Sequence, residues 1–263
     1  MKILFVGDIV GGVGRRCLAR WLPPLRRQHA IDFVVGNGEN AAGGLGATPK
    51  ILEEMSSTGL QAITLGNHTW RQKELVTGIE PLKNVVRPAN YPPGTPGRGS
   101  QVIALPDGRK VGVVNLVGRV YMDAADCPFR VGRHVVEQMR EQTPIVLVDF
   151  HAEATAEKVA MGWYLDGVCS AVLGTHTHVQ TSDARVLPDG TAYITDVGMT
   201  GPRDSVIGVE RDMVIQKFIT GIPVRFKTAQ GPAMLCGAIV EVDDTSGRAT
   251  SIQAITQCDG EDA

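Results

Sequence analysis

The chain has 263 residues, of which 43% are hydrophobic and 21% charged, and its formal net charge is −2. This is the composition of a globular protein that can bury a large core, so it excludes a disordered chain. Charges of both signs are interspersed without a basic stripe, so we expect no duplex nucleic acid as a partner. No apolar stretch approaches the roughly 18–20 residues that span a bilayer, so we expect no membrane partner.

The five cysteines are scattered along the chain and none forms a C-x-x-C pair. An odd number of scattered cysteines favours reduced thiols and a cytoplasmic setting. The first residues lack the pattern of a signal peptide, because Asp8 and nearby glycines interrupt their apolar run. We therefore predict a cytoplasmic protein with a single domain over residues 1–263. The sequence leaves the subunit number open and is compatible with a homo-oligomer.

The first predicted strand covers residues 2–7 and ends at Asp8. A glycine loop is expected at residues 11–14, followed by a helix that the pair Pro23-Pro24 should bend or break. The loop lacks both G-x-G-x-x-G and the Lys-Ser/Thr of a P-loop. We therefore do not interpret it as a nucleotide-binding loop.

The second and third strands each end in residues that can bind a metal. Residues 32–38 lead to Glu39-Asn40, and residues 60–64 lead to Asn67-His68. An amide beside an imidazole at a strand end is unusual for a core or a plain turn, whereas both side chains are metal ligands. Between these strands, Thr48-Pro49 predicts a helix start, with Thr as N-cap and Pro at the first position.

The remaining elements are helices, strands and hairpins that suggest a second sheet. Helices predicted over residues 129–142 and 153–165 each precede a strand, and these strands end at His151 and at His176-Thr177-His178. The other predicted elements are β structure over 84–118 with a turn at 106–108, a hairpin turning at 188–190, a helix near 210–219, and strands at about 234–243 and 248–256. This order fits a two-sheet core with helices outside it.

Five strand ends therefore present polar side chains, and in open α/β sheets sites form at the carboxyl ends of strands. In the His-x-His run, alternate side chains share one side, so both imidazoles can face one site. The set combines oxygen and nitrogen donors and contains no cysteine, which suits iron or manganese, or zinc, better than calcium or magnesium. There are enough donors for two divalent ions, which about 3.5–4 Å apart can generate a hydroxide nucleophile and hold two phosphoryl oxygens.

These residues resemble the motifs of the calcineurin-like metallophosphoesterases, which read D-x-H, G-D-x-x, G-N-H-[DE], a lone His and G-H-x-H on a four-layer αββα sandwich. The chain has the corresponding runs in the same order: Gly7-Asp8, Gly38-Glu39-Asn40, Gly66-Asn67-His68, His151 and Gly174-Thr175-His176-Thr177-His178. It departs from the pattern at Val10, where a His is expected, and at Glu39, where an Asp is expected. The resemblance implies an α/β fold of two mixed sheets with outer helices.

The two departures, together with the runs at residues 149–155 and 195–199, resemble the YmdB-like bacterial subfamily over essentially the whole chain. That resemblance implies a phosphodiesterase that acts on a small substrate, a 2′,3′-cyclic nucleotide. It assigns His68 as general acid and Asp149 and Glu153 as partners that orient imidazoles. The implied ligands are Asp8, Glu39, Asn40 and His178 for the first metal, with Asn40 in place of the missing His, and Glu39, Asn67, His151 and His176 for the second.

Two other functions remain open from the sequence. The first is a metal-dependent hydrolase of another class, such as an amidohydrolase. The His-x-His of such an enzyme would lie on the first strand of a barrel, whereas the His-x-His of this chain begins at residue 176. The second is a non-catalytic metal-binding regulatory module, which would have no use for an acid such as His68. We interpret His29 and His134 as structural, because neither has a candidate partner nearby in the sequence.

Overall fold

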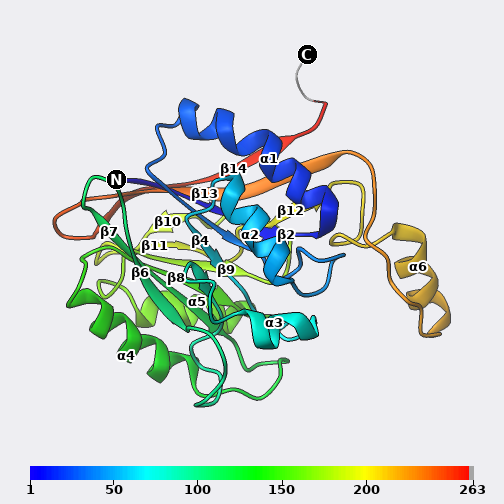
Figure 1. Ribbon diagram of the computed structural model, residues 1–263, viewed down its shortest axis with the longest axis horizontal. Helices are drawn as coiled ribbons and strands as arrows, with labels where there is room; N and C mark the ends of the chain where they lie inside the picture. Colours follow the sequence, from blue (N-terminus) through cyan, green and yellow to red (C-terminus); the bar gives the residue numbers. More distant parts are fainter. Residues whose placement is uncertain (261–263) are drawn as a thin grey trace.

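The computed structural model describes residues 1–260, which form two mixed β-sheets stacked face to face (Figure 1). In the larger sheet β14 (Ala249–Cys258) pairs with β13, and the strand order is β2 (Asp8–Ile9), β12 (Met199–Pro202), β13 (Ala233–Val242), β1 (Lys2–Val6), β3 (Phe33–Asn37), β4 (Ala62–Thr64), β5 (Val85–Val86). In the smaller sheet the order is β10 (Arg185–Val186), β11 (Ala192–Ile194), β9 (Ala171–Thr175), β8 (Val146–His151), β7 (Lys110–Val117), β6 (Ser100–Ala104).

Alternation along the strands divides the core into three layers. Phe5 and Phe33 point inward from the larger sheet and pack with Leu147 of the smaller one, forming the core between the sheets. Leu4 and Val34, one position away on the same strands, belong to the core on the outer face. The strands are apolar on both faces because both faces are covered, as expected for parallel strands.

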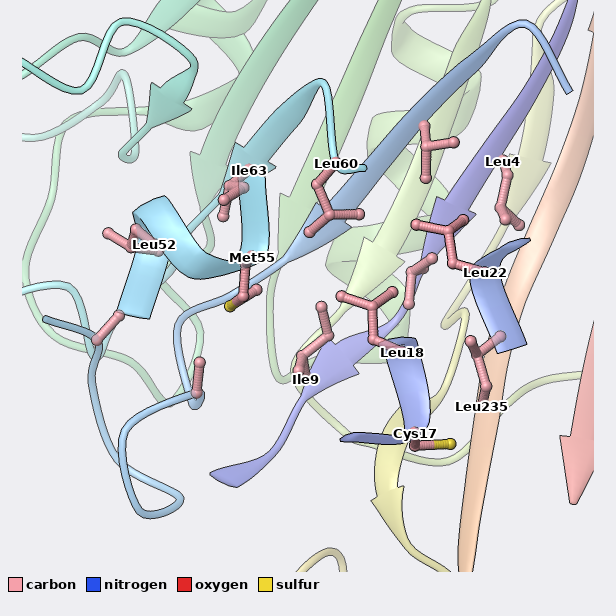
Figure 2. Packing of buried hydrophobic residues seen from close by; sticks show 14 of the residues in the cluster. Leu4, Ile9, Cys17, Leu18, Leu22, Leu52, Met55, Leu60, Ile63 and Leu235 are labelled. Atoms are coloured by element: carbon pink, nitrogen blue, oxygen red, sulfur yellow. The ribbon is translucent and has the colours of Figure 1, made fainter. Parts of the chain in front are cut away.

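Helices cover the outer face of each sheet. On the larger sheet lie α1 (Gly11–Gln28) and α2 (Pro49–Thr58), and Figure 2 shows Leu18 and Leu22 of α1 and Met55 of α2 packed over the strands. On the smaller sheet lie α4 (Pro128–Arg140) and α5 (Thr155–Tyr164). The predicted four-layer αββα sandwich is confirmed. Two further helices are α3 (Lys73–Gly78) and α6 (Arg211–Thr220), the latter projecting from the body (Figure 1).

The structure corrects two predictions about α1. Residues 11–14 are its first turn rather than a loop, and Pro23-Pro24 do not break the helix, which continues to Gln28. At Gly14 the helix approaches the larger sheet so closely that a Cβ would lie 2.3 Å from the Thr200 carbonyl oxygen, so the glycine serves packing. The prolines remove two backbone donors, but their fixed φ is helical, and the buried Leu22 and Leu25 anchor the turns on either side.

Most other local predictions are confirmed. Thr48 caps α2 by accepting a hydrogen bond from the Ile51 N–H, and the two hairpins turn at 106–108 and 188–190. The strand β12 was not predicted, because its sequence M-T-G-P contains two residues that strands disfavour. Within residues 1–260 no helix has both the length and the apolar character needed to cross a membrane.

Candidate metal centre

The predicted site residues meet where parallel strands of the two sheets end. Strands β1, β3 and β4 are parallel neighbours in one sheet, and β8 and β9 are parallel neighbours in the other. The ends of these strands and the segments that follow them bring all eight predicted residues into one continuous cluster: Asp8, Glu39, Asn40, Asn67, His68, His151, His176 and His178.

One half of the cluster is centred on His151, which is fully buried. Its Nε2 lies 3.1 Å from Glu39 Oε1, 2.9 Å from Asn67 Oδ1 and 3.0 Å from His176 Nδ1. The ligand atoms of Glu39, His151 and His176 all lie within 4.8 Å of one another. Four donor atoms of the types that bind transition metals therefore face one point. We call these four residues the His151 half.

A chain of hydrogen bonds sets the orientation of the His151 ring. The Thr175 hydroxyl donates to Asp149 Oδ1 at 2.6 Å, so it accepts from His151 Nδ1, which lies 2.8 Å away. This leaves the lone pair of Nε2 facing the cluster, the state that a metal requires. Asn37 donates to the other oxygen of Asp149 at 3.0 Å, which fixes the carboxylate in turn. Asp149 therefore acts through Thr175, a residue that sequence reasoning missed.

His176 is oriented from outside the cluster. Its Nε2 lies 3.1 Å from Glu153 Oε2, so Nδ1 is the nitrogen that faces His151. Gly66 allows this packing, because a Cβ there would lie 2.4 Å from Glu39 Oε2 and 2.5 Å from His151 Cδ2. The glycine of the G-N-H run thus brings the Asn67 loop against the other ligands.

The other half of the cluster contains Asp8, Asn40 and His178, and we call it the Asp8 half. Asp8 is fully buried, and its Oδ2 accepts a hydrogen bond from the His176 backbone N–H at 3.1 Å. Its Oδ1 has no hydrogen-bond partner within residues 1–260 and lies 3.6 Å from His178 Nε2. His178 donates from Nδ1 to the Ile207 carbonyl at 2.9 Å, so Nε2 is the nitrogen that faces inward. A buried carboxylate oxygen without a donor fits a cation-binding position.

Asn40 is the residue that we predicted to take the place of the His that is missing at Val10. Its Nδ2 lies 3.1 Å from Glu39 Oε1 and 3.3 Å from His178 Nε2, while its Oδ1 lies 2.8 Å from His68 Nδ1. A half-turn of the amide would present the oxygen to the Asp8 half. Val10 is buried, and a Cβ on Gly208 would lie 2.9 Å from Val10 Cγ1. The segment around Gly208 thus packs closely against Val10, which leaves little room for a larger side chain.

The electrostatics of the cluster favour positive charge. Burial raises the pKa of Asp8, but His178 and His151 outweigh it and hold that pKa below its usual value. Burial lowers the pKa of His178, but the Asp8 carboxylate raises it more, to about 9. Burial likewise raises the pKa of Glu39, yet His151 and His68 bring it well below its usual value. Carboxylates that hold protons on neighbouring imidazoles also stabilise a metal cation in the place of those protons.

His68 lies at the edge of the cluster. Its backbone N–H donates to Glu39 Oε2 at 2.9 Å, and its ring Nδ1 lies 2.8 Å from Asn40 Oδ1. The side chain is 24% exposed. Because Nδ1 is engaged within the cluster, Nε2 is the nitrogen available to a bound molecule.

The loop that carries His176 and His178 is strained and held by a buried ion pair. Both residues have positive φ, 101° and 66°, a region that residues other than glycine rarely adopt. Asp196 accepts hydrogen bonds from the Thr177 N–H and hydroxyl at 3.1 and 2.7 Å, and Lys158 Nζ pairs with the same carboxylate at 2.7 Å. Sequence reasoning missed Lys158, because a lysine on an amphipathic helix normally faces solvent.

Two stacked mixed sheets with this cluster at their strand ends define a metallophosphoesterase-type fold. A family model described as YmdB-like protein matches residues 4–255. The chain therefore belongs to the YmdB-like family, as its motifs predicted. The barrel expected for an amidohydrolase is not the architecture found, so that alternative is not favoured.

Individual relatives cover nearly the whole chain. A Bacillus subtilis protein named 2′,3′-cyclic-nucleotide 2′-phosphodiesterase is 48% identical over 97% of this chain and 96% of its own length. A solved structure of a hypothetical protein from Thermus thermophilus is 42% identical with a TM-score of 0.91, covering 98% of this chain and 99% of that one. A structure described as a novel phosphatase from Mycoplasma pneumoniae is 34% identical, also with a TM-score of 0.91, covering 98% and 93%.

Proposed function

We propose that this chain is a metal-dependent phosphodiesterase that hydrolyses 2′,3′-cyclic nucleotides. The observation that carries the proposal is the position of Glu39, whose Oε1 lies 3.1 Å from His151 Nε2 in one half and 3.1 Å from the Asn40 amide in the other. One carboxylate between two groups of donors suits a centre with two ions. The name of the Bacillus subtilis relative, with 48% identity over 97% of the chain, supports the reaction and the substrate class.

The centre would hold two divalent transition-metal ions, iron or manganese ahead of zinc. Asp8, Asn40 and His178 would hold the first, Asn67, His151 and His176 the second, and Glu39 would bridge them. Carboxylate, amide and imidazole donors without sulfur suit these metals. When bound, such ions supply a nucleophile from water at neutral pH and stabilise charge on the phosphoryl oxygens. Elemental analysis after saturation with Mn²⁺ or Fe²⁺ should give two ions per chain, and one or fewer would overturn the two-ion centre.

His68 would protonate the leaving oxygen. Its Nδ1 is engaged by Asn40, so Nε2 would carry the proton to the ester. A positioned acid contributes about 10²–10⁴-fold when the leaving group needs a proton, as a ribose oxygen does. His68→Ala should therefore keep both metals, retain much of the activity on an aryl phosphodiester, and lose activity heavily on a cyclic nucleotide. Equal losses on both substrates would assign His68 to phosphate binding, and loss of metal would make it a ligand.

We expect diesters to be preferred over monoesters, because a monoester dianion benefits from additional cations. Lys158, the only buried lysine or arginine within residues 1–260, is already paired with Asp196. Arg15 of α1 lies 3.7 Å from Glu54 of α2, and Arg71 lies in the loop before α3. Faster hydrolysis of a simple phosphate monoester than of its methyl diester would contradict this preference.

The setting of the enzyme is also part of the proposal. The five cysteines form no disulfide within residues 1–260, which supports a reducing compartment such as the cytoplasm. A single domain and a homo-oligomer remain predictions, which size measurement in solution and limited proteolysis would test.

A further inference from the structure

A groove of about 360 Å³ lies beside the metal centre, and Asn67 of the His151 half lines it. Its other walls include Trp70, Arg71, Tyr91 and Asp123. This volume lies within the range of small-molecule sites in proteins. The groove therefore has the size of a ligand site and shares one residue with the candidate centre.

Three loops build the groove, and each follows a strand that runs toward the centre. Trp70 and Arg71 follow β4, Tyr91 follows β5, and Asp123 follows β7. Strands β4 and β5 are parallel neighbours, and β7 is parallel to β8, which ends at His151. The groove thus opens at the same edge of the sandwich as the metal ligands, where substrates of α/β proteins bind.

Two half-buried aromatic rings form part of the wall. The ring centroids of Trp70 and Tyr91 are 6.5 Å apart, with an angle of 35° between the planes. Trp70 packs against the outer core, and the Tyr91 hydroxyl donates to the Gly66 carbonyl at 3.0 Å, next to Asn67. Both rings are therefore held in place by contacts that leave part of their surface facing the groove.

Opposite charges complete the lining. Arg71 and Asp123 are exposed, and neither side chain has an ion-pair partner in the part of the chain that the structure describes. A guanidinium donates to ring nitrogens and carbonyl oxygens, whereas a carboxylate accepts from amino groups. Aromatic faces beside such donors and acceptors match the chemistry of a nucleobase, which stacks through its faces and forms hydrogen bonds at its edges.

We propose that this groove is the nucleoside subsite, where the base stacks on Trp70 and its edge contacts Arg71 and Asp123. The proposal rests on the proposed function, since it places the base of the cyclic nucleotide whose phosphate lies at the metal centre. Purines should bind better than pyrimidines, because a larger ring covers more of the aromatic surface.

The first test compares substrates with and without a base. Trp70→Ala should raise KM for 2′,3′-cyclic AMP on the order of tenfold to a hundredfold, the effect of removing one stacking partner. The same variant should leave KM for glycerol 1,2-cyclic phosphate, which has the cyclic ester and no base, unchanged. Trp163→Ala removes an exposed tryptophan of α5, whose ring lies against the Arg185 guanidinium of β10, and should change neither value. Equal rises on both substrates would show that Trp70 supports the Asn67 loop and would overturn the subsite.

The second test does not depend on turnover. The chain has three tryptophans, so Trp21→Phe combined with Trp163→Phe leaves Trp70 as the single indole emitter. Adenosine should quench this emission saturably, and Asp123→Ala should weaken the quenching. No saturable quenching would overturn the subsite even if cyclic nucleotides are hydrolysed. Saturable quenching without hydrolysis of any cyclic nucleotide would retain the subsite and refute the proposed function.

If the Trp70→Ala variant of the first test fails to fold, Trp70→Leu replaces it. Leucine keeps an apolar side chain in the core contact and removes the aromatic face.

Discussion

The two halves of the candidate centre share Glu39 but are built differently. In the His151 half, the Thr175 hydroxyl and Asp149 fix the central ring, and three donor atoms lie within 3.1 Å of its Nε2. In the Asp8 half, an oxygen of Asp8 has no hydrogen-bond partner within the described residues, and His178 depends on the carbonyl of Ile207, which is 51% exposed. Buried hydrogen bonds arrange ligands before a metal arrives. We therefore expect the His151 half to bind its ion more tightly.

Glu39→Gln should have the largest effect, because it removes the charge that both halves share. The amide keeps the shape of the side chain, but we expect loss of both ions and a fall in kcat/KM on the order of 10³-fold, since each ion contributes several kcal/mol. Metal analysis and steady-state kinetics measure the two effects. Glu137→Gln is the control, since Glu137 lies exposed on α4 and pairs with Arg133, away from the ligands. Retention of one tightly bound ion in Glu39→Gln would show that the carboxylate serves one half only.

Lys158→Met should have an effect of similar size on a different quantity: it should lower the free energy of unfolding. The substitution leaves Asp196 buried without its cation, and breaking a buried pair in this way costs about 3–5 kcal/mol. Urea denaturation measures the loss. The double variant Lys158→Met with Asp196→Asn should recover most of it, because the amide oxygen can still accept from Thr177. The loop between His176 and His178 supplies a ligand to each half, so Lys158→Met should weaken both ions together. Weakening of one ion alone would mean that the halves are anchored separately.

The sequence was sufficient to predict which residues meet at the candidate centre, but it did not reveal the groups that hold these residues in place. The strand-end motifs are local patterns, so the runs around Asn67 and His176 could be recognised without the fold. Lys158 and Thr175 act on side chains that are distant in sequence or belong to another layer, and nothing local distinguishes them from a surface lysine and a strand threonine. The same is true of Gly14, which was predicted to lie in a loop. A glycine is needed there because α1 approaches Thr200 closely, and this contact cannot be read from the local sequence. Tertiary packing overrode local preference there.

Thr175→Val tests whether the bracing of the His151 half has the effect we infer. Valine keeps the volume but removes the hydroxyl between His151 and Asp149, so the ring loses the partner that sets its tautomer. Loss of such an orienting partner costs 10–100-fold in metal affinity. We expect this loss at the second ion only, measured by competition with a chelator. Thr191→Val is the matched control, since Thr191 is also buried but bonds to the Cys169 carbonyl far from the ligands. An equal loss at the first ion would contradict the separation of the two halves.

The smallest effect is expected from Asn40→Ala in the Asp8 half. A neutral amide is a weaker ligand than a carboxylate, so we expect the affinity for the first ion to fall about tenfold, the low end of the range for polar groups around a metal. The second ion should be unaffected, and His68 would keep Glu39 Oε1, which lies 3.2 Å from its Nδ1.

Asn40→Asp then separates the two roles that the amide can have. If the Asn40 oxygen turns to the ion in place of the missing imidazole, a carboxylate should bind the first ion at least as tightly as the amide does. Asn40 could instead act by donating from Nδ2 to Glu39 Oε1, which lies 3.1 Å away in the structure. In that case the carboxylate of the Asp variant would repel Glu39 and weaken the binding of both ions. Chelator competition on the two variants distinguishes these outcomes, and the second outcome would assign Asn40 to the support of Glu39 rather than to the metal.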